Sequence, residues 1–72
     1  MDSKHLDAYK YMADKLKQAR IEAGLGQGDA ARLIDKSQSY ISKIEAGCLR
    51  LDLVQLNELA KLYKKGLDYF LK

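Results

Sequence analysis

With 72 residues, the chain lies near the lower limit at which one apolar core holds a fold without a metal or a disulfide, so we expect a single domain over residues 1–72. It has one cysteine, Cys48, no apolar run near the roughly 18 residues of a membrane span, and no signal-peptide pattern, which favours a cytoplasmic protein over a secreted or membrane-spanning one. The net charge of +3 is spread evenly along the chain and is too small an excess to identify a nucleic-acid-binding protein.

The spacing of the apolar residues predicts an all-α fold. Apolar residues recur every three or four positions, and the chain has no proline and no alternating β-branched stretch. Glycines are typical of helix ends rather than helix interiors. Those that divide this chain into about five helices are Gly24, Gly26, Gly28, Gly47 and Gly66.

The first helix is expected over residues 6–23, with residues 1–10 forming its N-terminal extension. Gly24 can adopt the left-handed conformation that ends a helix. One face of this helix carries the residues expected to point inward, which are Leu6, Tyr9, Ala13, Leu16 and Arg20.

Two short helices follow, over residues 27–34 and 38–46, joined by a turn of about three residues. Ser37 can accept a hydrogen bond as the N-cap of the second of them, and Gly47 can end it. The side chains expected to point inward are Ala30, Ala31 and Ile34 from one helix and Ile41, Ile44 and Glu45 from the other.

The last part of the chain predicts a helix from a cap at Asp52 through Lys65, ended by Gly66, and a short helical turn over residues 67–72. The apolar face of the helix is expected to bury Leu53, Leu56, Leu59, Ala60 and Tyr63. The turn is expected to add Leu67, Phe70 and Leu71 to the core.

The outer face of the helix over 38–46 has an unusual composition. It presents Ser39, Ser42 and Lys43, and it carries no exposed acid if Glu45 points inward. A slim polar face without negative charge suits a DNA groove, where it can match base edges and phosphates. A merely solvated helix face is the alternative interpretation of the same residues.

The run from Gln27 to Gly47 resembles the helix-turn-helix of the phage-repressor (lambda-repressor and Cro-like, XRE) family. The resemblance rests on Gln27 opening one helix, Ala31 within it, and the stretches Ser37-Gln38-Ser39-Tyr40 and Ile44-Glu45-Ala46-Gly47 in register. It extends over about residues 12–71 and implies a compact five-helix DNA-binding domain, with the helix-turn-helix over about 27–46. The functional expectation is a sequence-specific transcriptional regulator, most simply a repressor that binds a palindromic operator as a homodimer.

The resemblance also implies a role for each matching residue. Gln27 would bond to a phosphate and brace Gln38, whose amide matches the donor and acceptor pattern of adenine. Lys43 would contact guanine or a phosphate, whereas Arg50 belongs to a loop that touches more distant phosphates. The complete set expected to contact DNA is Gln27, Lys36, Ser37, Gln38, Ser39, Tyr40, Ser42, Lys43 and Arg50.

Arg20 and Glu45 are expected to form a structural ion pair, as repressors of this type can join the first and third helices. The chain departs from the family pattern at Gly26 and Gly28, which predicts a weak cap and a flexible first turn for the second helix. Asp35 stands where the family usually has glycine, and aspartate tolerates the left-handed conformation better than most residues.

Other functions find little support in the sequence. The glycines over 24–28 follow a helix and lack the spacing of a phosphate-binding loop, and His5 and Cys48 have no partners at metal-ligand or nucleophile–base spacing. We therefore expect no enzyme activity, no cofactor and no metal. An antitoxin-like or adaptor module that uses the same fold to bind a protein partner is the alternative.

Overall fold

The computed structural model describes the backbone of residues 3–71 and the side chains of residues 8–71. Four α-helices and one 3-10 turn follow one another along this part of the chain, which contains no strand. They are α1 (Ser3–Glu22), α2 (Gln27–Leu33), α3 (Gln38–Glu45), α4 (Leu53–Leu62) and η1 (Leu67–Phe70). The predicted all-α class is confirmed, and the fifth predicted helix is a single 3-10 turn.

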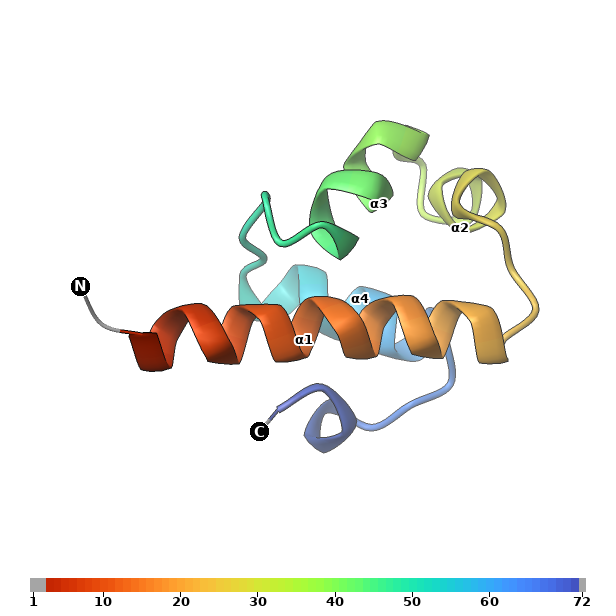
Figure 1. Ribbon diagram of the computed structural model, residues 1–72. Coiled ribbons are helices and arrows are strands. Elements are labelled where there is room, and N and C mark those ends of the chain that lie inside the picture. The colour runs from red at the N-terminus through yellow and green to blue at the C-terminus, as the bar shows by residue number, and fades with distance from the viewer. Residues whose placement is uncertain (1–2, 72) are drawn as a thin grey trace.

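The long helix α1 crosses the whole molecule and separates its two halves (Figure 1). The pair α2 and α3 lies on one side of α1, whereas η1 lies on the other side. Because α2 and α3 form one packed unit above a long helix, the outer face of α3 points away from the rest of the domain (Figure 1).

The core lies where these elements meet. Leu16, Ile41, Leu59 and Phe70 are its largest fully buried side chains, and they come from four different elements. The remaining buried apolar residues are Ala13, Ala19, Ala30, Ala31, Ile44, Leu56, Ala60 and Tyr63. The residues predicted to point inward from the first three helices are therefore buried or half-buried wherever the structure describes their side chains. Tyr9 and Ile34 are among the half-buried ones, and the side chain of Leu6 lies outside the described residues.

Two residues predicted for the core are on the surface. Leu53 is 69% exposed and Leu71 is 57% exposed. Leu53 is the first residue of α4, so its side chain precedes the turns that pack against the core. Leu71 follows η1 in an extended conformation, and its side chain lies at the edge of a hollow instead of in the core.

Helix α4 ends at Leu62, three residues before the predicted end. The left-handed residue after it is Lys64 (φ 60°), and Gly66 instead takes an extended conformation before η1. The Lys65 N–H donates to the Ala60 carbonyl at 2.9 Å, the long bond of a Schellman ending. This bond closes the helix one turn early and turns the chain toward η1.

The turn between α2 and α3 is built from local bonds. Asp35 adopts the expected left-handed conformation (φ 58°), and Ser37 Oγ accepts a hydrogen bond from the Tyr40 N–H at 3.2 Å. At the start of α2, Gly26 has no capping side chain, but Asp29 Oδ2 accepts a bond from the Gly26 N–H at 3.2 Å. Asp29 thus supplies a cap that the sequence prediction of a flexible first turn overlooked.

Candidate DNA interface

The outer face of α3 is polar and open to solvent. Gln38, Ser39, Ser42 and Lys43 are all exposed, whereas Ile41 and Ile44 on the opposite face are 1% and 3% exposed. Burial of the two isoleucines fixes the rotation of α3 about its own axis. The four polar side chains therefore form one surface, which we call the recognition face.

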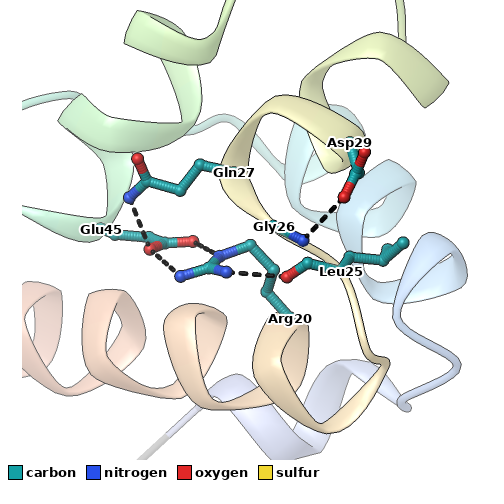
Figure 2. A network of polar contacts seen from close by, with 6 residues as sticks. All are labelled: Arg20, Leu25, Gly26, Gln27, Asp29 and Glu45. Atoms are coloured by element: carbon teal, nitrogen blue, oxygen red, sulfur yellow. Dashed lines mark hydrogen bonds and ion pairs between the residues drawn. The ribbon is translucent and has the colours of Figure 1, made fainter.

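Glu45, the only acid of α3, is drawn away from the recognition face by Arg20 of α1. Arg20 Nε donates to Glu45 Oε2 at 2.7 Å, and Nη2 donates to Oε1 at 3.1 Å, so the pair is bidentate (Figure 2). Arg20 Nη1 also donates to the Leu25 carbonyl at 2.8 Å. The ion pair expected between these two residues is formed, with side chains only 10% and 4% exposed.

This pairing sets the electrostatics under α3. The bond to Glu45 raises the pKa of Arg20 even though burial opposes the charged form. The guanidinium therefore stays positive and balances the carboxylate inside the domain. Lys43 is then the only charged side chain exposed on α3, and its positive charge suits a phosphate-rich partner.

Gln27 takes part in the same network rather than bracing Gln38. Its Nε2 donates to Glu45 Oε1 at 3.2 Å (Figure 2). A buried carboxylate is a stronger acceptor than a neutral amide, which explains why the predicted Gln27–Gln38 contact is replaced. Gln38 instead lies over the start of α2, where a Cβ added to Gly28 would be 3.7 Å from Gln38 Oε1.

Lys36 and Tyr40 lie beside the recognition face; Lys36 is exposed, whereas Tyr40 is half-buried. The Lys36 ammonium lies 5.4 Å from the centroid of the Tyr40 ring. The Tyr40 hydroxyl is buried without a hydrogen-bond partner among the described residues, and burial, with Glu58 and Asp52 nearby, raises its pKa. Tyr40 thus packs against the core beside Lys36, and its expected place near a DNA strand stays a prediction.

Arg50 lies in the loop between α3 and α4, where its guanidinium carbon is 4.8 Å from the centroid of the Tyr9 ring. Its side chain is exposed, so it is open to a partner. Ser37 is also exposed; its hydroxyl oxygen caps α3, which leaves its proton available to an acceptor.

A comparison with protein-family models matches residues 16–70 to a family described as helix-turn-helix. The match covers α2, α3 and the turn between them, together with the last part of α1 and all of α4 and η1. The chain belongs to the phage-repressor (XRE) helix-turn-helix family. Members of this helix-turn-helix family are DNA-binding regulators rather than enzymes, so this domain is a DNA-binding helix-turn-helix domain.

The other comparisons add no relatives to this family assignment. Neither the curated proteins nor the solved structures gave a match. Over the described part of this helix-turn-helix domain, no helix is long and apolar enough to cross a membrane. Nor do His, Cys, Asp and Glu side chains there gather in groups of three that could hold a metal ion.

Three contacts of the helix-turn-helix domain were missed at the level of sequence. They are the Gln27–Glu45 bond, the Asp29 cap and the stacking of Arg50 on Tyr9. A signal existed only for Asp29, which stands three residues after the cap position, where a side chain can reach back to the N-cap N–H. Tyr9 and Arg50 are 41 residues apart, and no local pattern joins them.

Proposed function

We propose that the protein is a sequence-specific transcriptional repressor that binds a palindromic operator as a homodimer. The observation that carries the proposal is the recognition face, which is exposed and carries no acid, because Glu45 of the same helix is paired with Arg20. In the helix-turn-helix docking mode this face enters the major groove. Repression then follows because a protein bound there occludes polymerase.

The side chains of the recognition face offer chemically distinct contacts. The Gln38 amide can donate and accept at once, which matches an adenine edge, and Lys43 can donate to O6 and N7 of guanine. Ser39 and Ser42 are short enough to let the backbone of α3 approach the base pairs. Lys36 and Ser37 flank this face and are placed to contact phosphates, which fix the position of the helix without reading sequence.

An exposed apolar surface supports the dimer. Leu53 and Leu71 are 69% and 57% exposed and line a hollow of about 290 Å³ together with residues of α1, α4 and η1. Val54, the residue after Leu53, is 78% exposed. An isologous interface would bury this surface against its copy in a second chain. Two recognition faces related by a two-fold axis would then meet major grooves about 34 Å apart.

Selection from a pool of random DNA duplexes tests this function. We expect the protein to enrich a palindrome whose half-sites are centred about 10 base pairs apart. Lys43→Ala should change the preferred bases, whereas Lys61→Ala, the same charge change on the exposed part of α4, should leave them unchanged. Enrichment of no sequence, with binding that depends on salt alone, would contradict the proposal.

A protein-interaction module is the second candidate, because a separate apolar surface lies at the opposite end of α1. Leu33 is 60% exposed and lines a hollow with Leu25, Leu62 and Lys64, and Ile21, in the last turn of α1, is 57% exposed. Leu33→Lys separates the candidates: it should leave operator binding intact if DNA is the main partner. Stoichiometric capture of one protein by the wild type but not by Leu33→Lys, without any DNA binding, would favour the second candidate.

A further inference from the structure

The first half of α1 contains a contact that lies outside the family match. The match begins at residue 16, whereas α1 begins at Ser3 and continues without a break to Glu22. Tyr9 belongs to this additional part of the helix, and its ring lies under the guanidinium of Arg50, 4.8 Å from the guanidinium carbon. A residue of the extension thus contacts the loop that follows the recognition helix.

Tyr9 and Arg50 differ in their exposure to solvent. The half-buried ring lies between two hollows, one lined by Met12 and Leu51 and the other by Ala13 and Gly47. Arg50 is exposed, and among the side chains of residues 8–71 it forms no ion pair with a carboxylate. The half-buried aromatic ring therefore favours one position for a long side chain that has no carboxylate partner there.

We propose that Tyr9 is a positioning residue that holds Arg50 ready for a DNA phosphate. This inference rests on the proposed function, since it assumes that the recognition face docks on DNA. A free arginine loses rotamer freedom when it binds a phosphate, and the Tyr9 ring removes part of that loss before binding. A cation–π contact is not a hydrogen bond, so the guanidinium can still donate its N–H groups to the phosphate.

The expected size of the effect follows from cation–π contacts at exposed sites, which change an equilibrium about two- to fivefold. A dimer carries the contact twice. Loss of the ring should therefore weaken operator binding by about four- to twenty-five-fold. Loss of a phosphate contact should also lower the slope of log affinity against log salt concentration, by about one for each Arg50 that no longer binds.

The test measures fluorescence anisotropy of a labelled duplex with the full chain and five variants. Tyr9→Leu removes the ring and keeps an apolar side chain, whereas Tyr9→Phe keeps the ring. Tyr11→Leu is the matched control on the same helix, because the Tyr11 ring contacts Lys15 and not Arg50. Arg50→Ala is made alone and together with Tyr9→Leu to give a double-mutant cycle.

We expect Tyr9→Leu to weaken binding and lower the salt slope, Tyr9→Phe to restore both, and Tyr11→Leu to change neither. In the Arg50→Ala background, Tyr9→Leu should have no further effect. Unchanged or tighter binding by Tyr9→Leu would overturn the inference, as would an equal loss in the Arg50→Ala background, which would assign Tyr9 to the apolar dimer surface instead.

The same series on a duplex of random sequence separates this inference from the proposed function. Phosphate contacts do not depend on base sequence, so the Tyr9 and Arg50 effects should persist there. A protein that shows them but prefers no operator would contradict the repressor proposal alone. Specific binding that is indifferent to Tyr9 would contradict only the inference drawn from Tyr9.

Discussion

Arg20 and Glu45 act on stability and on the recognition face through one contact. Their bidentate pair joins α1 to the end of α3, and Gln27 adds a third bond from α2 (Figure 2). Three helices therefore meet at one carboxylate. The orientation of the recognition face depends on the same side chain that would otherwise repel DNA.

Removal of either partner should be costly, because the other would remain buried and charged. We expect Glu45→Ala and Arg20→Ala each to lower the free energy of unfolding by roughly 3–5 kcal/mol, measured by urea denaturation. Arg20→Lys should recover little, since an ammonium cannot reach both carboxylate oxygens and the Leu25 carbonyl in the same way. A decrease in the free energy of unfolding below about 1 kcal/mol would contradict this, because exposed surface ion pairs contribute no more than that.

Tyr63 provides a test at alkaline pH. Burial, with a smaller effect of Glu45, raises its pKa from 10.0 to about 12. The folded state thus prefers the neutral phenol, so its stability is complete below pH 10 and falls as the pH rises toward 12. Tyr63→Phe should flatten this fall, as followed by urea unfolding at several pH values; an equally steep fall in the variant would contradict the assignment.

The residue scale also shows where sequence reasoning ends. The resemblance pointed to the Arg20–Glu45 pair, but it placed Gln27 against Gln38 and gave no sign that the Tyr40 hydroxyl is buried. Sequence reasoning did not foresee these two features, since they depend on which groups lie nearby in the folded chain. Glu45 attracts the Gln27 amide, and the core surrounds the Tyr40 hydroxyl.

At the scale of elements, the helices could be predicted better than their ends. Apolar spacing located all four α-helices, and Gly24 and Gly47 have the predicted left-handed conformation (φ 76° and 77°). The end of α4 was misplaced because Lys64 takes that conformation in place of Gly66. The hydrogen bond from the Lys65 N–H to the Ala60 carbonyl stabilises this ending, and the side chains alone do not predict it.

Gly28 tests the start of α2. The glycine lies inside the first turn, and an added Cβ would meet Gln38 Oε1 at an ordinary contact distance of 3.7 Å. Gly28→Ala should therefore raise the free energy of unfolding by about 0.5–1 kcal/mol, since alanine loses less backbone freedom in a helix. Thermal unfolding followed by circular dichroism measures this change, and a lower stability would show that the contact with Gln38 is tighter than the geometry indicates.

At the scale of the whole molecule, the surface could not be predicted from periodicity alone. Leu53 and Leu71 fit the apolar pattern of the core, yet a domain of 72 residues has too little interior for every apolar side chain. They leave an apolar surface between the N-terminal half of α1 and the start of α4, and Val54, the residue after Leu53, is exposed as well. This surplus is the physical basis of the proposed dimer.

Leu53→Lys should separate the dimer without unfolding the chain, because the side chain is already 69% exposed. Sedimentation equilibrium should show a dimer for the wild type and a monomer for the variant. Leu33→Lys is a matched control, with the same substitution at a 60% exposed leucine on α2. If the Leu53→Lys variant is still a dimer, the interface does not include Leu53 and the proposed dimer surface is wrong.

The central claim is that the recognition face reads base edges, and Gln38 tests it most directly. Wild type and Gln38→Ala are titrated against the selected operator and against duplexes that each carry one substituted base pair. The wild type should lose about 1–3 kcal/mol at each contacted pair, and Gln38→Ala should lose that discrimination at one position in each half-site while retaining it at the others. Unchanged discrimination at every position would contradict the claim that this face of α3 reads the sequence.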